Sequence, residues 1–479
     1  MQEGNRRLTA GERLDRIPYG PFHRKMLALI GAGMFLDGFE LYMTAGVMAA
    51  LVSTGFSTME LNAAFVSATF FGMLLGAWSA GILGDRFGRR FTYQFNLLLF
   101  GAASVIAFFA PNMEMLIGLR FFMGLGLGAE VVCSFAMLSE FVPPQVRGRM
   151  IGWLAFLTNL PLFVTGLLNL WIIPKFGWEY MFLIGGVAAL IIWFLRKSMP
   201  ESPRWLELQG RTEEADAILQ SIEAGTRKHA PVQPEKAKAG KRLVSEAAAA
   251  NGPRVRLATL FSRPYIGKTL TGMLLHSVVN LCFYGFIGWM PSFFVKQGAT
   301  VATSLVWTTV MALGAPVGAL IGLSLSDRIG RKPSIIASCL LASLFGAAMP
   351  FVAGNSAALM AAGFSCFTAI YVLHAVGYAL YVPEMFPTEI RLRGVGVCSS
   401  VARLSTAGVQ TVIVALFAWG GVMAVVGAIN ACLILLAAVV AIVGTETRGK
   451  TLEQIADTDS NRALIDSVLS QPAGARSVD

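Results

Sequence analysis

Twelve apolar blocks, each about 20 residues long and so able to cross a bilayer as a helix, dominate this chain of 479 residues. We place them at about 26–52, 63–84, 91–110, 114–138, 150–173, 179–196, 265–294, 301–325, 333–353, 356–382, 394–417 and 420–443. Only 14% of the residues are charged, against roughly 25% in soluble globular chains. The sequence therefore predicts an all-α membrane protein with twelve transmembrane helices.

The distribution of basic residues predicts the orientation of the chain. Among the 38 Lys and Arg, Lys175 and Lys296 fall in predicted outer loops, Arg120, Lys268 and Arg403 fall within spans, and Arg196, at the inner end of the sixth block, is counted with the inner segments. All others lie in segments that are inside if the N-terminus is inside, which is the asymmetry of the positive-inside rule. We therefore expect both termini in the cytoplasm, and the net charge of +10 reflects topology rather than binding of a nucleic acid.

Three sequence motifs recur at nearly constant spacing. "GDRFGRR" at 84–90 returns as "SDRIGRK" at 326–332, and "EFVPPQVRGRMIG" at 140–152 returns as "EMFPTEIRLRGVG" at 384–396. "PESPRWLE" after the sixth block is answered by "TETRGKTLEQ" after the twelfth. Such repetition indicates two related six-helix bundles.

The repeat gives the expected domain organisation. We predict a cytoplasmic segment at 1–25, bundles at 26–196 and 265–443, a cytoplasmic linker at 197–264 and a cytoplasmic tail at 444–479. In the linker, "PRWLELQGRTEEADAILQSI" predicts two short amphipathic helices. Their expected apolar face consists of Trp205, Leu206, Ala215, Ile218 and Leu219.

These repeated motifs resemble those of the major facilitator superfamily. "GDRFGRR" resembles its loop signature after the second helix, and "RFFMGLGLG" at 120–128 resembles its fourth helix. "PESPRWL" and "ETRGKTLEQI" are similar to marks of the sugar-porter-related branch, and the resemblance extends from Phe35 to Ile455. It implies a secondary transporter whose two pseudo-symmetric bundles enclose a central cavity, and a protein that is not an enzyme.

The repeated inner loops place acidic and basic residues at matched positions. Opposite charges on helix ends can pair when the inner side closes, and each partly exposed pair is worth about 1 kcal/mol or less. Several such pairs can bias a two-state equilibrium, and the resemblance implies the same role; alternatively, the basic residues only enforce topology. The expected gate residues are Asp85, Arg89, Glu140, Arg147, Asp327, Arg331, Glu384 and Arg391.

The stretch "MFLDGFELYMT" at 34–44 places two carboxylates in the first span. Asp37 and Glu40 are three residues apart and share a helix face, roughly 16–21 Å from the inner end at 1.5 Å per residue. In the fold that the resemblance implies, Arg120 of the fourth span can face them. A static ion pair of Arg120 with Asp37 or Glu40 explains one acid but leaves the others, including Glu130, without an Arg. We therefore expect Asp37 to carry a proton, with Glu40 or Glu130 next.

The second half carries a different charge. Arg403 lies about nine residues into the eleventh span, roughly 14 Å deep, and no Asp or Glu lies in the last six blocks. A guanidinium in this setting can bind a ligand carboxylate bidentately; alternatively, it pairs with an acid of the first half. Further candidates for contact with a planar substrate are His276, Asn280, Phe283, Tyr284 and Trp289 of the seventh span and His374 of the tenth.

Within the superfamily, the chain resembles bacterial aromatic-acid and nicotinate proton symporters. The matching stretches are "DGFE" at 37–40, "GAE" ending at Glu130, "YGFIGWMPSF" in the seventh span, "YVPEMFPTEIR" and Arg403. The seventh span has His276, Ser277 and Asn280 where sugar porters carry a Gln-Gln pair. The resemblance implies that a first-helix acid couples to protons and that Arg403 receives an organic anion.

The sequence thus predicts import of a small organic, aromatic carboxylate by proton symport with alternating access. The alternative is a proton-coupled sugar or polyol carrier. We expect H⁺ as coupling ion, no cofactor and no metal, the lipid bilayer and the organic anion as partners, and a monomer in the bacterial inner membrane. All six Cys lie in apolar blocks without metal-ligand spacing, and we interpret them as small buried hydrophobes.

Overall fold

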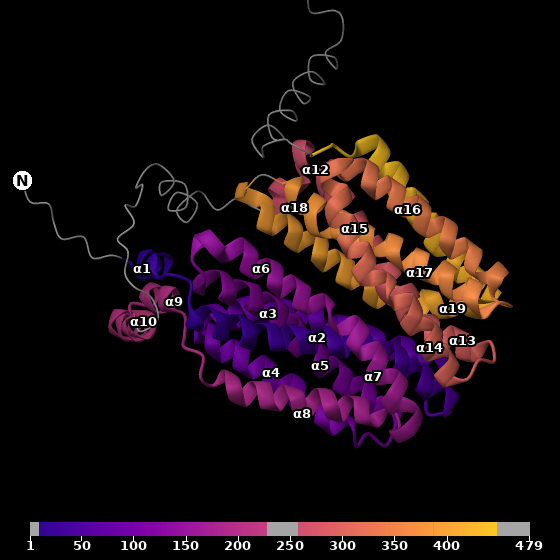
Figure 1. Ribbon diagram of the computed structural model, residues 1–479, viewed down its shortest axis with the longest axis horizontal. Coiled ribbons are helices and arrows are strands. Elements are labelled where there is room, and N and C mark those ends of the chain that lie inside the picture. Colours follow the sequence, from indigo (N-terminus) through magenta and orange to yellow (C-terminus); the bar gives the residue numbers. More distant parts are fainter. Residues whose placement is uncertain (1–8, 228–256, 387, 448–479) are drawn as a thin grey trace, which may run out of the picture. The chain divides into compact units, whose positions relative to one another are not determined.

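The computed structural model describes residues 9–227, 257–386 and 388–447, and helices account for nearly all of them (Figure 1). The chain forms two compact units. Unit 1 comprises Met1–Lys236, Gly288–Thr309 and Gln410–Val414, and unit 2 comprises Ala237–Ile287, Val310–Val409 and Ala415–Asp479. Most of the predicted tail lies outside the described residues, as do the side chains of Asp85, Arg147, Asp327 and Arg391.

Unit 1 holds the helices of the first predicted bundle and the linker. They are α1 (Ala10–Arg16), α2 (Pro21–Ser53), α3 (Met59–Phe87), α4 (Arg89–Ala107), α5 (Met113–Phe141), α6 (Pro144–Asn159), α7 (Pro161–Phe176), α8 (Glu179–Arg196), α9 (Pro203–Leu208) and α10 (Thr212–Arg227). Pro161 begins a new helix within the fifth predicted span. Unit 1 also contains α13 (Met290–Lys296), which packs on α2, and most of α14 (Val301–Ala312). The compact units therefore differ from the predicted bundle boundaries at these segments.

Unit 2 holds the remaining helices, several of them irregular. They are η1 (Leu257–Phe261), α12 (Arg263–Asn280), η2 (Leu281–Phe286), η3 (Ile287–Trp289, shared with unit 1), α15 (Gly314–Arg328), α16 (Arg331–Ala348), η4 (Met349–Val352), α17 (Ser356–Leu373), η5 (His374–Tyr381), α18 (Val382–Glu384) and α19 (Thr388–Val443). Two of them, η2 and η5, are π-helical, and they interrupt the seventh and tenth predicted spans. Such π-bulges occur frequently at functional sites.

The predicted spans correspond to helical segments. Ten described helical stretches are long and apolar enough to cross a membrane, and the last, Arg393–Val443, covers two predicted spans. Its backbone leaves helical geometry at Gly420 and Gly421, where the sequence predicts the turn between them. The third predicted span, α4, is less apolar than the others because it contains polar residues such as Thr92, Tyr93 and Asn96. These three side chains are buried. The structure therefore agrees with the predicted all-α, twelve-helix fold.

Glycines bring the long helices into close contact in both units. A Cβ on Gly72 or Gly76 of α3 would collide with the backbone of α5, and one on Gly314 or Gly318 of α15 would collide with that of α17. Each pair is a small-xxx-small motif, which lets membrane helices approach closely. The two pairs have the same spacing as the "GDRFGRR" repeat, so the repetition extends to helix packing.

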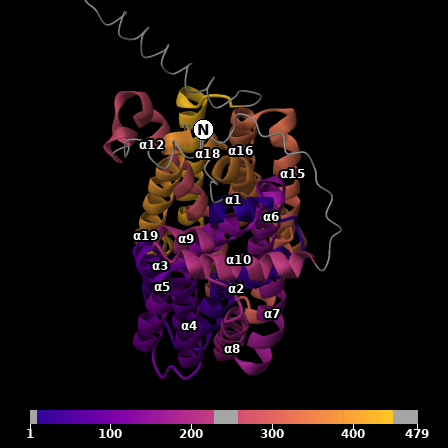
Figure 2. The same cartoon turned by 90° about the vertical axis from the view of Figure 1, so that its left-hand side faces the viewer.

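The linker forms the predicted helix pair at one end of unit 1. Trp205, Leu206, Ala215 and Leu219 are buried and Ile218 is half-buried, so α9 and α10 place the five expected residues on their covered side. Figure 2 shows α10 lying across the ends of the long helices of this unit, where it contacts α1 and α2. Ion pairs tie Arg13 of α1 to Asp216 at 2.5 Å and to Glu223 at 3.0 Å.

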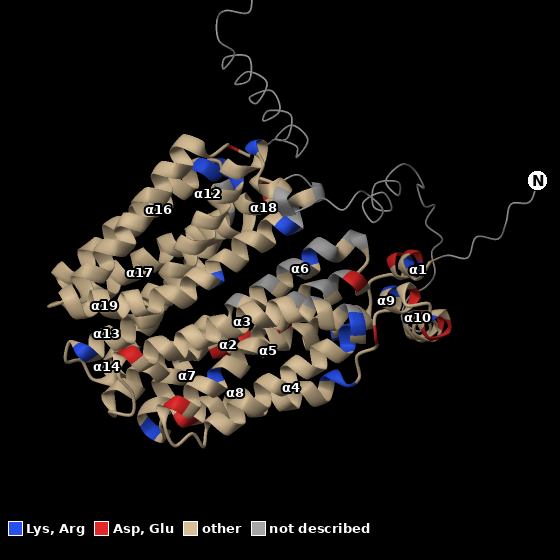
Figure 3. Cartoon of the chain, turned by 180° about the vertical axis from the view of Figure 1, so that it is seen from behind, with Lys and Arg blue, Asp and Glu red and all other residues tan. Residues whose placement is uncertain are grey.

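Charged side chains are sparse along the long helices. Figure 3 shows Lys, Arg, Asp and Glu gathered on α1, α9 and α10 and near helix ends, with few inside the long helices of unit 1. Charge in the apolar region is costly and marks functional sites. The exceptions on α2, α5 and α8 therefore define the candidate site.

We predict that Gly76→Ala destabilises the protein by about 1–3 kcal/mol, the usual cost of overpacking. The added methyl group would meet the carbonyl carbon of Leu125 at 2.8 Å. Gly118→Ala in α5 is the matched control because nothing lies within 4 Å of its added methyl group. Thermal unfolding of the detergent-solubilised protein measures both, and an equal effect of the two substitutions would contradict the close approach of α3 and α5.

Candidate functional site

The first buried ion pair of unit 1 joins α2 and α5. The guanidinium of Arg120 pairs with the Glu40 carboxylate, and both side chains are fully buried. Arg120 also donates hydrogen bonds to the Glu40 carbonyl at 3.1 Å and to the Thr44 hydroxyl. Its guanidinium lies 4.7 Å from the ring centre of Phe65 and 5.8 Å from that of Phe182. Of the two partners considered for Arg120, Glu40 makes the direct contact.

A second buried ion pair joins α5 and α8. Arg196 Nη2 lies 2.8 Å from Glu130 Oε1, and Arg196 Nε donates to the carbonyl of Leu29 in α2 at 3.0 Å. The guanidinium stacks 4.0 Å from the ring centre of Tyr93. The Tyr93 hydroxyl in turn hydrogen bonds with Ser134 at 3.0 Å. Glu130 thus belongs to a polar network that connects four helices.

Asp37 is the third buried carboxylate of unit 1. It is 4% exposed and interacts electrostatically with Arg196. Among the described residues, the buried carboxylates and guanidiniums of unit 1 are Asp37, Glu40, Glu130, Arg120 and Arg196. Three acids and two bases carry one net negative charge when all are ionised. A single proton therefore neutralises the set.

Arg196 corrects the charge count made from the sequence, which treated this residue as an inner-side cation. That interpretation set three buried carboxylates of the first bundle against one guanidinium, Arg120. The structure adds a second buried guanidinium, so the carboxylates outnumber the guanidiniums by one. Arg196 is the last residue of α8, so its sequence position alone fits a helix end in contact with water. Its guanidinium is instead buried, in contact with the Glu130 carboxylate, the Leu29 carbonyl and the ring of Tyr93.

Unit 2 contains a cluster of aromatic and imidazole rings around its π-helical segments. His276 of α12 lies 3.9 Å from Tyr378 of η5, centre to centre, and His374 lies 5.1 Å from Tyr378 and 5.1 Å from Phe283. Tyr371 packs against Phe283 at 4.8 Å. The cluster brings together three residues expected from the sequence and adds Tyr371 and Tyr378. The sequence signal for both tyrosines was their spacing, because Tyr371 and Tyr378 lie three residues before and four residues after His374 and so share its helix face.

The other candidates of unit 2 lie on neighbouring helices. Arg403 of α19 is half-buried, as are Asn280 at the end of α12 and Tyr284 in η2. The hydroxyls of Ser277 and Ser405 lie 3.5 Å apart, so the turn of α19 that carries Arg403 runs beside α12. Arg403 therefore shares a region of unit 2 with the helix that holds His276.

Trp289 has a different setting, because its contacts are with residues of unit 1. Its indole N–H donates to Gln410 Oε1 at 2.7 Å, and its ring stacks on Phe293 at 6.1 Å between centres. The side chain is fully buried. A structural role accounts for these contacts, and substrate contact by Trp289 stays a prediction.

Four of the expected gate residues form two ion pairs in the described structure. Arg89 Nε lies 3.5 Å from Glu140 Oε1 in unit 1, and Arg331 Nε lies 3.2 Å from Glu384 Oε2 in unit 2. The two pairs occupy matched positions of the sequence repeat, and all four side chains are partly exposed. Their opening and closing during transport stays a prediction.

Two glutamates for which the sequence predicted no role bind the first backbone N–H groups of the helices that carry these arginines. Glu201 accepts hydrogen bonds from the backbone N–H groups of Arg89 and Arg90 at 3.0 and 3.1 Å. Glu446 accepts the corresponding bonds from Arg331 and Lys332 at 2.9 and 3.0 Å. Each thus caps the N-terminus of a long helix, a favourable place for negative charge. Burial raises the pKa of Glu201, although these backbone hydrogen bonds oppose the shift.

The glycine before each capped helix is required by the backbone. Gly88 and Gly330 have φ values of 99° and 111°, a region that residues with a Cβ rarely adopt. A Cβ there would also contact the carboxylate of Glu201 or Glu446. The motifs "GDRFGRR" and "PESPRWLE" therefore contact each other in unit 1, where together they form a helix cap. The corresponding motifs of unit 2 form the equivalent cap. The constant spacing of the repeats was the signal that could have revealed it.

We predict that Arg196→Met destabilises the protein by about 3–5 kcal/mol, because it leaves Glu130 buried without its counter-charge. The double variant Arg196→Met/Glu130→Met should regain most of this loss, since it removes both charges. Thermal unfolding in detergent measures the cycle, with Arg24→Met at an exposed site as control. A double variant no more stable than Arg196→Met would contradict the importance of the pair.

Comparison with known proteins identifies the family. The family described as "Sugar (and other) transporter" matches residues 27–458. The chain is 33% identical to the inner membrane metabolite transport protein YdjE of Escherichia coli, over 94% of this chain and 98% of that protein. It is also 33% identical to the niacin transporter NiaP of Acinetobacter baylyi, over 92% of this chain and 98% of that one.

Solved structures agree on the fold. The inward open conformation of the xylose transporter XylE from E. coli superposes with a TM-score of 0.68 at 18% sequence identity, covering 91% of this chain and 99% of XylE. This likeness concerns the arrangement of helices. Together, the matched family, the relatives and the fold show that this chain belongs to the sugar-porter-related branch of the major facilitator superfamily of membrane transporters.

Proposed function

We propose that this transporter imports a small aromatic carboxylate together with a proton. The observation that carries the proposal is the buried charge set of unit 1, in which three carboxylates face two guanidiniums. Ionised charge in the middle of a membrane is expensive and is retained chiefly for function. One proton brings the set to neutrality, which removes the penalty for closing the site away from water.

Asp37 is our first choice for the proton-binding residue. Glu40 and Glu130 each hold a guanidinium directly, and protonating either would weaken a buried ion pair. A proton on Asp37 leaves both ion pairs intact. Glu40 and Glu130 are the next candidates, because redistribution of one proton among three nearby carboxylates is characteristic of coupled sites.

The substrate anion is proposed to bind in unit 2. Arg403 offers a planar fork of N–H donors that suits a carboxylate, on the helix that runs beside α12. The rings of His276, Phe283 and His374 supply faces and edges for packing against a planar ring. The niacin transporter among the relatives favours an aromatic acid of this size.

The proposed mechanism is alternating access. The outward-facing cavity accepts the proton in the first bundle and the anion in the second, and the bundles then rock around the bound substrate. The pairs Arg89–Glu140 and Arg331–Glu384 are proposed to belong to the cytoplasmic gate, with Asp85, Arg147, Asp327 and Arg391. We propose the bacterial inner membrane as location, both termini in the cytoplasm and a monomeric, non-enzymatic protein without cofactor.

A sugar or polyol carrier is the second candidate. The matched family is described by its sugar transporters, and proton coupling in the first bundle would serve such a substrate equally. The half-buried Arg403 favours an anion over a neutral sugar. The substrate panel below separates the two.

We predict that purified protein in liposomes accumulates nicotinate or benzoate when the outside is more acidic than the inside. Asp37→Asn should abolish accumulation but retain exchange of labelled for unlabelled substrate, because exchange needs no net proton movement. Glu114→Gln, at an exposed carboxylate in the first turn of α5, is the control and should behave as the unchanged protein. Equal uptake with and without the gradient would count against proton coupling.

We predict that nicotinate- or benzoate-like acids, and not hexoses, raise the thermal unfolding temperature. Arg403→Gln should weaken binding of the acid by about tenfold or more, the effect of losing a charged hydrogen bond of about 1.5–3 kcal/mol. Lys296→Gln, at the exposed last residue of α13, is the charge-matched control. Stabilisation by hexoses that is insensitive to Arg403→Gln would favour the sugar carrier.

A further inference from the structure

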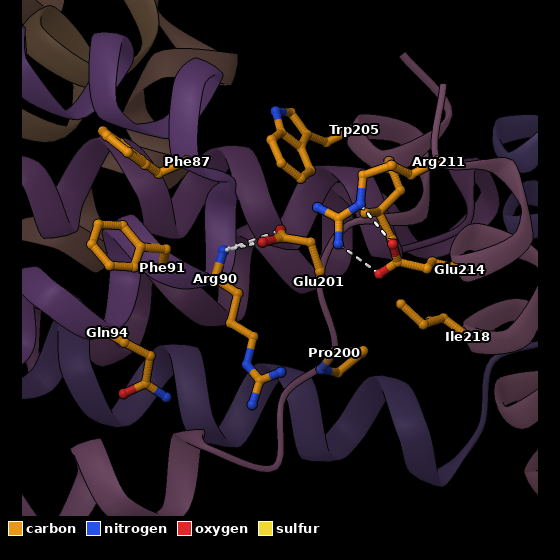
Figure 4. A pocket seen from close by; sticks show the side chains of 11 residues that line it. Phe87, Arg90, Phe91, Gln94, Pro200, Glu201, Trp205, Arg211, Glu214 and Ile218 are labelled. Atoms are coloured by element: carbon orange, nitrogen blue, oxygen red, sulfur yellow. Dashed lines mark hydrogen bonds and ion pairs between the residues drawn. The ribbon is translucent and has the colours of Figure 1, made fainter. Parts of the chain in front are cut away.

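A cavity of about 520 Å³ lies at the end of unit 1 that carries α9 and α10. It is separate from the buried ion pairs, and no step of the proposed transport uses it. Figure 4 shows Phe87, Phe91, Arg90 and Gln94 on one side of this cavity, with Trp205 and Glu201 on the other. Its walls thus combine aromatic rings with a cation, a carboxylate and an amide.

The carboxylates that line the cavity are already engaged. Glu201 caps α4 through the backbone of Arg89 and Arg90, and Glu214 holds Arg211 through hydrogen bonds of 2.7 and 2.6 Å. The Arg90 guanidinium donates to the carbonyl of Lys197 at 2.7 Å. Within the described part of the chain it forms no ion pair with a carboxylate, so its charge is available to an anion.

Two further cations, which we call the rim cations, are neighbours of residues that line the cavity, and within the described part of the chain neither forms an ion pair with a carboxylate. The ammonium group of Lys197 lies 4.0 Å from the ring centre of Trp193, and the guanidinium of Arg86 lies 5.3 Å from that of Phe87. The lining itself holds two cations, Arg90 and Arg211, and two carboxylates, Glu201 and Glu214, so Lys197 and Arg86 give the described residues at this place an excess of positive charge. An anionic group is therefore favoured there over a neutral or cationic one.

Gln94 provides a second, independent sign of a missing ligand. Its amide nitrogen and oxygen are both buried, and neither has a hydrogen-bond partner among the described residues. Buried polar atoms are satisfied in most proteins, and an orphaned one calls for an explanation. Gln94 lies four residues after Arg90, hence on the same helix face and about 6 Å further along α4. A ligand that engages both groups must carry an anion and, one helical turn away, a second hydrogen-bonding group.

An exposed aromatic strip continues along α4 from the cavity. Phe87, Phe91 and Phe95 are 49%, 49% and 43% exposed, and the rings of Phe91 and Phe95 stack at 6.1 Å with 10° between their planes. Because α4 corresponds to the third predicted span, we expect this strip to face the lipid chains. An elongated apolar group could lie along it.

We propose that this cavity is a binding site for an anionic phospholipid. The phosphate binds Arg90 and the rim cations, an ester carbonyl accepts from the Gln94 amide, and an acyl chain follows the aromatic strip. These contacts match the order of groups in a glycerophospholipid, with the phosphate outermost and the ester carbonyls between it and the chains. A soluble phosphate compound would leave the strip and Gln94 without a partner.

A lipid at this position would act on the helix cap. It would contact α4 through Arg90 and α9 through Trp205, and Glu201 already ties these two parts together. The neighbouring Arg89 pairs with Glu140. Binding of the lipid should therefore stabilise the α4 terminus and the α9–α10 pair.

The test is retention of lipid by the full-length protein. Detergent-purified protein is mixed with phosphatidylglycerol or with phosphatidylcholine of the same chains, and bound lipid is counted by native mass spectrometry. We expect phosphatidylglycerol to be retained over phosphatidylcholine, and Arg90→Gln to weaken its retention about tenfold, as for the loss of one charged hydrogen bond. Arg24→Gln removes an equally exposed charge on α2 and should leave retention unchanged.

Two further arms separate the possible causes. Gln94→Leu keeps every charge and should weaken retention less than Arg90→Gln, so it tests the site even if Arg90→Gln fails to fold. Glycerol phosphate in millimolar excess should not displace the lipid. Equal retention of both lipids, equal loss in Arg24→Gln and Arg90→Gln, no effect of Gln94→Leu, or displacement by glycerol phosphate would each overturn the proposal.

Discussion

The packing of unit 1 depends on buried carboxylates and guanidiniums that neutralise one another between apolar helices. Helix α5 contributes one member to each buried ion pair, Arg120 towards α2 and Glu130 towards α8, and Arg196 also reaches a carbonyl of α2. The glycines of α3 bring α5 close on another side. Buried ion pairs seldom stabilise a protein more than apolar residues of the same size would. Their presence among apolar helices is therefore better explained by a process that needs charge there, such as the proposed proton-coupled cycle.

Unit 2 follows a different principle, since its spans are irregular where its candidate ligand groups lie. The π-helical segments η2 and η5 begin directly after Asn280 and Leu373, and they carry Phe283, His374 and Tyr378. A π-bulge widens a helix turn and redirects its side chains, which lets rings from two spans converge. It also concentrates bending at that point. In the proposed function, a substrate that packs on these rings would contact both spans at the points where their helices are irregular.

The sequence was sufficient for the helices and much of the charge distribution, because both depend on local patterns. Block length located the spans, and the repeated motifs located Arg89, Glu140, Arg331 and Glu384. Arg196 was not recognised as a partner of a buried acid, because a residue at a helix end can turn inward or outward, and only tertiary contacts decide which. The same reason explains the unforeseen roles of Glu201 and Glu446, whose partners are distant backbone amides. The π-helical turns left no trace in the hydrophobic pattern, since one additional residue in a turn hardly alters an apolar block.

The two glutamate caps add a physical argument about the proposed gate. Glu201 and Glu446 accept hydrogen bonds from backbone amides of α4 and α16, so they fix the start of each helix, whose first residue, Arg89 or Arg331, carries a guanidinium of the proposed gate. Those guanidiniums pair with Glu140 and Glu384 at partly exposed positions, where an ion pair is worth little and exchanges easily. A rigid backbone anchor combined with a weakly held side chain is what a reversible latch requires. In the proposed gate, the anchor would keep each helix start in place while the ion pair beside it opens and closes.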